Sequence, residues 1–146
     1  MEIEIRTPLS PAEWSEYYDL RYRILREPLG QPRGSERNEG DDTGTHFALF
    51  QNSMIEAIAR LDYADEAAKI AQVRFVAVNK TLQGKGYGKK IMCAAEDAAR
   101  LRGDRKMILH ARDYAVDFYL KLGYTLIGES YLLFGQLQHY LMEKEF

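Results

Sequence analysis

Residues 73–89 read VRFVAVNKTLQGKGYGK and decide the fold. An apolar, β-branched run comes first, a turn with glycine at 84, 86 and 88 follows, and apolar residues then recur at helical spacing as far as Gly103. The pattern predicts a buried strand over 70–78, a glycine-rich turn, and a helix that ends at Gly103. A second strand over 106–110 would lie parallel to the first, after a right-handed crossover.

The segments on either side predict the rest of a mixed sheet. Ser10, Pro11 and Glu13 have the pattern of a helix N-terminus with a capping box, and the helix should continue for about 14 residues. A polar loop over 28–44 precedes an antiparallel hairpin over 46–63. The other predicted elements are a strand over 2–7, a short helix over 114–122, and closing strands over 124–128 and 138–145. This order predicts a mixed α/β (α+β) fold, with a central, mostly antiparallel sheet of about six to seven strands flanked by about four helices, in a single domain over residues 1–146.

Composition limits the classes of function. A chain of 146 residues with 46% apolar and 29% charged content fits one globular domain with one core. The formal charge of -2 disfavours binding to nucleic acid or to an anionic membrane. A single cysteine and an N-terminus without a signal pattern predict a reducing, cytoplasmic location. No metal site is expected, because the sequence has no Cys/His cluster.

The glycine-rich turn has the features of an anion site. The first N–H groups of a helix have no internal acceptor, and the helix dipole adds positive charge at the same end. Glycine lets the backbone approach a ligand, and Lys85, Lys89 and Lys90 add charge. A pyrophosphate fits these features, and a turn that only joins strand to helix is the structural alternative. A Walker loop is excluded because three residues, not four, separate Gly84 from Gly88, and a dinucleotide fingerprint because position 89 is not glycine.

Two motifs carry a resemblance to a known family. The stretch QGKGYG at 83–88 resembles the Q/R-x-x-G-x-G/A motif of GNAT acetyltransferases, in the same strand-to-helix position. The stretch AVDFYLKLGY at 115–124 resembles the A-x-x-F-Y-x-K-L-G-F/Y helix of that family. The resemblance extends over residues 70–128, and the N-terminal third is more loosely similar to the ElaA-like branch. It implies a GNAT-like acyl-CoA N-acyltransferase fold and an enzyme that uses acetyl-CoA and no metal.

The resemblance also implies roles for individual residues. Backbone groups of Val76 and Val78 would pair with the pantetheine arm of acetyl-CoA, as if it were an added strand. Tyr119 would protonate the departing thiolate, and packing in the core is its alternative role. Arg112 stands where many members carry Asn, so its contact with the pantetheine or a phosphate is left open. The pyrophosphate would be held by Gln83, Gly84, Lys85, Gly86, Tyr87, Gly88 and Lys89.

The sequence does not identify the general base. Direct transfer needs a neutral amine, and only about one lysine-like amine in a thousand is neutral at pH 7. For the histidines the alternative is a hydrogen-bonded structural role, and for the loop carboxylates it is a solvated connection. The acidic stretch 36–42 indicates a cationic acceptor. The candidate bases are His46, His110, Glu36, Glu39, Asp41 and Asp42.

Two further groups of side chains receive a structural interpretation. The arginines at 21, 23 and 26 follow helical spacing loosely and indicate a solvated face. Cys93 falls on the helix flank away from the apolar stripe and has no histidine near it in the sequence. A covalent acyl-cysteine route is therefore disfavoured.

The leading hypothesis is a cytoplasmic N-acetyltransferase. It would move an acetyl group from acetyl-CoA to a primary amine of a small molecule or peptide, by direct transfer in a ternary complex. The alternative from another class is a non-catalytic acyl-CoA-binding sensor or regulatory module, and a third is a plain protein-interaction domain with a structural glycine segment. Turnover separates the first two. No nucleic-acid or membrane partner is expected, and strand pairing at the C-terminal end is consistent with a homodimer.

Overall fold

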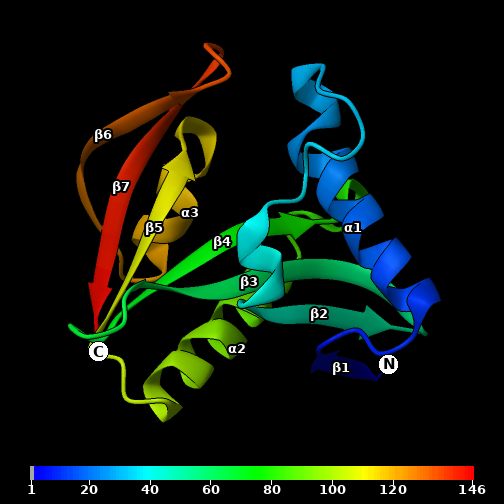
Figure 1. Cartoon of the computed structure of the whole chain (residues 1–146), viewed down its shortest axis with the longest axis horizontal. Coiled ribbons are helices and arrows are strands. Elements are labelled where there is room, and N and C mark those ends of the chain that lie inside the picture. The colour runs from blue at the N-terminus through cyan, green and yellow to red at the C-terminus, as the bar shows by residue number, and fades with distance from the viewer. Residues whose placement is uncertain (1) are drawn as a thin grey trace.

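Seven strands form one sheet, in the order β1-β2-β3-β4-β5-β7-β6 (Figure 1). The computed structural model describes residues 2–146. All neighbouring strands are antiparallel except β4 and β5, so the predicted mixed and mostly antiparallel sheet is confirmed. The elements are β1 (Ile3–Arg6), α1 (Pro11–Leu25), η1 (Glu27–Leu29), η2 (Glu39–Asp42), β2 (Thr45–Gln51), β3 (Met54–Asp65), β4 (Ile70–Val78), η3 (Lys80–Leu82), α2 (Tyr87–Leu101), β5 (Lys106–Arg112), η4 (Asp113–Ala115), α3 (Val116–Lys121), β6 (Thr125–Leu133) and β7 (Leu137–Glu145).

Local signals in the sequence set most of the helix boundaries. Ser10 Oγ accepts a hydrogen bond from the Glu13 N–H at 3.1 Å and so caps α1. The Glu13 carboxylate bonds the N–H of Leu9 at 2.8 Å, which closes the same helix start. Gly103 follows the end of α2 with a φ of 93°, as a C-terminal stop requires. Residues 2–146 contain three α-helices where about four were predicted, and the remaining helical segments are short 3-10 turns.

The two long helices cover opposite faces of the sheet. Ile91, Met92 and Ala95 of α2 pack with Leu49 and Ala57 of the hairpin β2–β3 in one buried cluster. Helix α1 forms a second cluster on the other face with the alternate strand residues Ala48, Ile58 and Ala77. Strand residues that alternate in sequence point to opposite faces, which is why one hairpin serves both clusters. Among the described residues, no helix has the length and apolar character needed to cross a membrane.

A β-bulge in the middle of β4 changes which residues face each helix. The pairing with β3 shifts between Ile58 opposite Ala77 and Arg60 opposite Arg74, so β4 holds one extra residue. Phe75 lies at the bulge with a φ of 56°. Before the bulge, Ala71 and Val73 pack on the α2 side, whereas beyond it Ala77 packs on the α1 side and Val76 and Val78 on the α2 side. The bulge therefore offsets the two halves of the strand by one residue.

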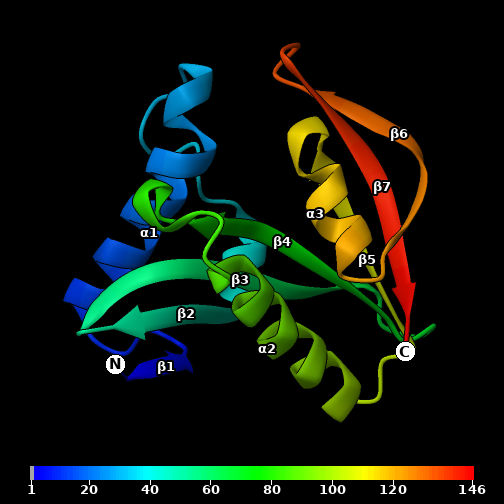
Figure 2. The same cartoon turned by 180° about the vertical axis from the view of Figure 1, so that it is seen from behind.

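Strands β4 and β5 pair along only part of their length. Their parallel register covers Ile70, Ala71 and Gln72 opposite 106–108, and no pairing follows. Figures 1 and 2 show the two strands diverging from this end, with α3 beside β5. Beyond Gln72 each strand has a free edge that faces the other, and the sheet opens between them.

Candidate active site

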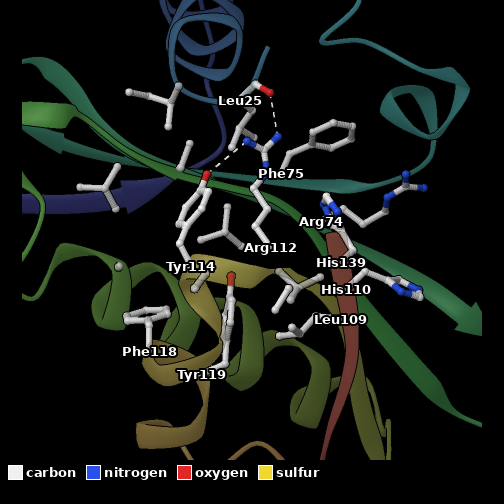
Figure 3. A pocket seen from close by; sticks show the side chains of 18 of the residues that line it. Leu25, Arg74, Phe75, Leu109, His110, Arg112, Tyr114, Phe118, Tyr119 and His139 are labelled. Carbon is white, nitrogen blue, oxygen red and sulfur yellow. Dashed lines mark hydrogen bonds between the residues drawn. The ribbon is translucent and has the colours of Figure 1, made fainter. Parts of the chain in front are cut away.

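The opening between β4 and β5 is a cleft of about 790 Å³. Strand β4 and the glycine-rich turn form one wall, and β5, α3 and the hairpin β6–β7 form the other. The last residues of α1 close a third side (Figure 3). The size is in the range of small-molecule and cofactor sites.

The glycine-rich turn presents unpaired backbone N–H groups. Within residues 2–146, the N–H groups of 84–89 donate to no protein acceptor. Gly84 and Gly86 have φ angles of 81° and 88°, a left-handed conformation that side chains rarely adopt, and Gly86 is the N-cap of α2 without a side-chain cap. These free N–H groups lie at the start of a 15-residue helix, so the turn has the geometry of an anion site.

Gly88 permits close contact between the turn and α3. A Cβ at this position would meet the Phe118 ring at 3.0 Å, tighter than most Cβ contacts, so the ring would have to shift by a few tenths of an ångström. The Phe118 ring therefore lies against the backbone at the start of α2, and the two GNAT-like motifs meet at this contact.

The predicted cofactor residues divide into two groups. Those that line the cleft are Val76, Val78, Gln83, Gly84, Gly86, Gly88, Lys89 and Arg112. Lys85 and Tyr87 do not line it, and the Tyr87 side chain points into the core, where its hydroxyl donates to Gln51 Oε1 at 2.7 Å. Helical geometry explains the difference, since consecutive residues at a helix start point in different directions.

The backbone of Val78 faces the cleft. The next N–H along the chain, from Asn79, donates to Glu56 O of the β3 strand at 2.8 Å, so the carbonyl of Val78 points the opposite way. That carbonyl accepts a hydrogen bond from the Gln83 side chain at 3.2 Å. Gln83 thus folds the glycine-rich turn back onto the end of β4.

Tyr119 is buried, yet its hydroxyl has no hydrogen-bond partner within the described residues. Its side chain lines the cleft and its ring packs edge-on against Phe118 and Tyr124, with centroids 4.9 and 5.8 Å apart. Burial raises the pKa of the Tyr119 hydroxyl, so the proton stays on it at neutral pH. Tyr119 therefore combines a packed ring with a hydroxyl at the cleft that has no partner among the described residues.

Arg112 spans the cleft from β5 to α1. Its guanidinium donates to the carbonyl of Leu25 at 2.7 Å and to the Tyr114 hydroxyl at 3.2 Å (Figure 3). Leu25 is the last residue of α1, where the helix dipole favours a cation. In this structure Arg112 thus ties two walls together.

Two histidines line the cleft, His110 and His139, and His46 does not. His139 Nδ1 lies 3.1 Å from the carbonyl of Leu137, which only accepts, so Nδ1 carries the proton and Nε2 the lone pair. Burial lowers the pKa of His139, and the nearby Arg112, His110 and Arg26 lower it further. The imidazole is therefore neutral at pH 7, and it stacks on Tyr131 with ring centroids 4.4 Å apart.

His110 corrects one expectation. A hydrogen-bonded structural histidine was predicted, but its Nδ1 is buried without a partner in the described residues. Burial, and then Arg74, lower its pKa. The pairing of β5 with β7 brings His110 and His139 together through Tyr131, and nothing in their sequence positions indicated this.

The other candidate bases lie outside the cleft. Asp41 is held by Arg21 and Arg60, each 2.8 Å from its Oδ1, and the side chains of both arginines are 0% exposed. The prediction that these side chains are solvated was thus wrong for Arg21 and Asp41, and also for Glu36, which is buried. Arg26 lines the cleft, and only Arg23 keeps an exposed pair, with Asp19. The sequence did not identify Arg26, Arg74 and His139 as cleft residues. The signal that could have found them is the excess of basic residues near the parts of β4 and β5 that face each other.

Cys93 is exposed on α2 and does not line the cleft. Among residues 2–146, no group of three or more His, Cys, Asp or Glu side chains is arranged to hold a metal ion.

Comparison with known proteins gives a consistent family. The sequence profile of the acetyltransferase (GNAT) family matches residues 8–124. An uncharacterized N-acetyltransferase of Bacillus subtilis, YjcF, is 29% identical over 126 residues, which cover 86% of this chain and 88% of that protein. The crystal structure of Escherichia coli ElaA superposes with a TM-score of 0.81 at 22% identity, over 99% of each chain. The PaiA N-acetyltransferase of Thermoplasma acidophilum, solved in complex with coenzyme A, gives 0.77 at 15% identity over 100% of each chain.

Proposed function

The chain belongs to the acetyltransferase (GNAT) family, and on that premise we propose that it transfers an acetyl group from acetyl-CoA to a primary amine. The membership predicted from the two sequence motifs is thus confirmed, and with it an acyltransferase class. The acetyl donor, the amine acceptor and the direct transfer in a ternary complex are the proposed part. The observation that carries the proposal is the row of free N–H groups at 84–89, at one end of a cleft that also contains the free hydroxyl of Tyr119.

The residues present fit the cofactor. A pyrophosphate would take the free N–H groups of the turn, with Lys89 supplying charge at the cleft wall. Backbone groups of Val76 and Val78 would pair with the pantetheine arm along the open edge of β4, which β5 leaves unpaired beyond Gln72. When bound, acetyl-CoA supplies the activated acyl thioester.

Tyr119 is the proposed acid for the leaving sulfur. Its raised pKa keeps the proton available, and its hydroxyl has no competing partner among the described residues. A positioned acid of this kind contributes about 10²–10⁴-fold to a rate.

His139 is the proposed proton acceptor on the amine side. Its hydrogen bond to Leu137 leaves Nε2 with the lone pair, and its lowered pKa keeps the imidazole neutral. The cations Arg26, Arg74 and Arg112 along the cleft disfavour a charged ammonium, so they also lower the pKa of a bound amine. His139→Gln should lower kcat and leave acetyl-CoA affinity unchanged, and an unaltered kcat would remove His139 from this role.

The proposal is tested by thermal unfolding with acetyl-CoA. Ligand at a hundredfold excess over Kd stabilises a protein by about 2.7 kcal/mol, or several degrees at this size. Dephosphorylated pantetheine, which lacks the pyrophosphate, is the control ligand and should give no comparable shift. An equal shift with both ligands, or none with acetyl-CoA, would contradict the assignment.

The two lysines of the turn offer a matched pair of variants. Lys89→Glu should remove most of the shift with acetyl-CoA because Lys89 lines the cleft, whereas Lys85→Glu should remove little because Lys85 does not. A shift without acetyl transfer to any amine would favour a binding module over an enzyme.

A further inference from the structure

The cleft carries positive charge without a compensating acid. Four permanent cations line it, and neither Asp nor Glu is among the lining residues. The acidic stretch 36–42, which indicated a cationic acceptor, contributes no residue to the wall, so it does not support a cationic acceptor at this cleft. The cations are Arg26, Arg74, Lys89 and Arg112, with the neutral imidazoles of His110 and His139 beside them.

None of the three cleft arginines forms an ion pair within the described residues. Arg74 is exposed, makes no hydrogen bond there, and has its guanidinium carbon 5.4 Å from the centre of the Phe75 ring. Arg26 donates only to the carbonyls of Ser35 and Leu25, and Arg112 only to the Leu25 carbonyl and a tyrosine hydroxyl. Each guanidinium therefore keeps its full charge, and Arg74 has all its donors free.

The repulsion between these charges lowers the pKa values of neighbouring cleft residues. Burial lowers the pKa of Arg26, and the charges of Arg112, Arg21 and Arg74 lower it further. Arg74 acts in the same direction on His110. Keeping such charges together costs free energy, and a bound anion would offset that cost.

The cofactor phosphates would lie too far away to be this anion. Arg74 precedes Val78 by four residues, or about 13 Å of strand, and the glycine-rich turn begins further on at Gln83. In Figure 3, Arg74, His110 and His139 lie on one side of Tyr119, and Phe118 lies on its opposite side. Arg74 thus lies away from the glycine-rich turn, at the end of the cleft where the acceptor would bind.

Building on the proposed function, we infer that the acceptor is a primary amine that also carries an anionic group, a carboxylate or a phosphate, which binds Arg74 with Arg26 beside it. A guanidinium binds either group through paired hydrogen bonds. The amine of the same molecule would then be directed toward His139 and the thioester.

The test measures binding and turnover with matched acceptors. The first set is a panel of amino acids, each against its own amide; the second is O-phosphoethanolamine against ethanolamine, with spermidine as a polycation. Binding is measured as the shift in melting temperature of the protein saturated with coenzyme A. This measurement involves no reaction rate, so the different amine pKa values of acid and amide do not affect it through the rate of attack. Turnover is read as kcat/KM with acetyl-CoA.

We expect at least one acid to bind and to be acetylated with a kcat/KM at least about tenfold above its amide. Arg74→Gln should reduce that preference by about tenfold, the loss expected for one charge-assisted hydrogen bond. Acetyl-CoA affinity should change little, and kcat/KM for the amide should fall much less than that for the acid, because only the acid loses the partner of its anionic group. Arg100→Gln is the control, because Arg100 is an exposed arginine of α2 outside the cleft. Whether carboxylate or phosphate binds better identifies the anion.

Other outcomes separate this inference from the proposed function. Amides or spermidine acetylated as well as the acids would overturn the inference and leave the transferase intact. Failure of every anionic amine to bind would also overturn it. Binding of an acid, weakened in Arg74→Gln, without acetyl transfer would uphold the anion site and count against the enzyme.

Discussion

Two groups of arginines surround Phe75, and they differ in whether a carboxylate compensates their charge. The guanidinium carbons of Arg21 and Arg60 lie 4.2 and 4.9 Å from the centre of the Phe75 ring, and those of Arg26 and Arg74 lie 5.6 and 5.4 Å from it. The first two are buried and share a carboxylate. The second two border the cleft and have none in the described residues. Compensated charge inside the fold is costly to unpair, whereas uncompensated charge at a cleft is available to a ligand.

Two buried tyrosines repeat the contrast. Tyr17 lies 2.8 Å from His46 Nδ1 and accepts from Arg21 at 3.2 Å, so its hydroxyl belongs to a closed network. Tyr119 is also buried, but its hydroxyl meets only the cleft. The same side chain thus supports the fold in one region and is free for chemistry in the other.

The largest effect should come from removing the shared carboxylate. Asp41→Asn leaves Arg21 and Arg60, both fully buried, without their common anion, and should lower the free energy of unfolding by about 3 kcal/mol or more. Urea denaturation measures this loss. Asp42→Asn, at an exposed neighbour without an ion pair in the described residues, should change it by less than about 0.5 kcal/mol. Equal losses would refute the contrast.

Next in size is the effect of Tyr119→Phe on rate. Removing the free hydroxyl should lower kcat by about 10²-fold, while acetyl-CoA affinity and the melting temperature stay close to those of the parent. Steady-state kinetics and a binding titration check this. A parent-like kcat would exclude Tyr119 as the acid.

Tyr17→Phe should have the complementary outcome. It leaves Arg21 and His46 short of a partner, so stability should fall by about 1–2 kcal/mol. Because Tyr17 does not line the cleft, kcat should be unchanged at a temperature where the variant is folded. A loss of rate with no loss of stability would reverse the roles assigned to the two tyrosines.

The smallest effect should come from mild acid. His46 Nε2 donates to the Asp41 carbonyl at 2.8 Å, so Nδ1 holds the lone pair that accepts from Tyr17, and burial lowers the pKa of His46. The pKa values of His110 and His139 are lowered too. The unfolded chain therefore binds more protons below about pH 6.5, so the contribution of these histidines to stability is complete above that pH and is lost as the pH falls below it.

The urea midpoint should accordingly be lower at pH 5.5 than at pH 7.5. His46→Gln should flatten the dependence partly, since His110 and His139 still contribute. Equal midpoints at the two pH values in the parent protein would contradict the lowered pKa values.

The sequence predicted the parts of the fold that local chemistry controls. Ser10 as a cap, Gly103 as a stop, β4 over 70–78 and the left-handed glycines of the turn follow from neighbouring residues. The bulge does not, because VRFVAV contains no glycine and Phe75 is an unusual residue for a positive φ.

Contacts between residues far apart in the chain could not be predicted from the sequence. Asp41 meets Arg60 across 19 positions of the chain. The sequence placed Asp41 in a polar loop and Arg60 in a strand of the hairpin, and nothing in it indicated that the two side chains pair. His139 entered the cleft only through the pairing of β7 with β5. The sequence therefore indicated the proposed cofactor half of the cleft, whose turn is one continuous segment, and gave little signal for the proposed acceptor half, which separate elements assemble.

The divergence of β4 and β5 also has a consequence for handling the protein. A strand edge with free N–H and C=O groups is a template on which another chain can add, and proteins normally cover or interrupt such edges. Here two such edges face each other inside the molecule, because β4 and β5 pair only as far as Gln72. A bound pantetheine arm would cover the β4 edge. Acetyl-CoA would then act as a conformational protectant, and the ligand-free protein would be the form most prone to self-association during storage or concentration.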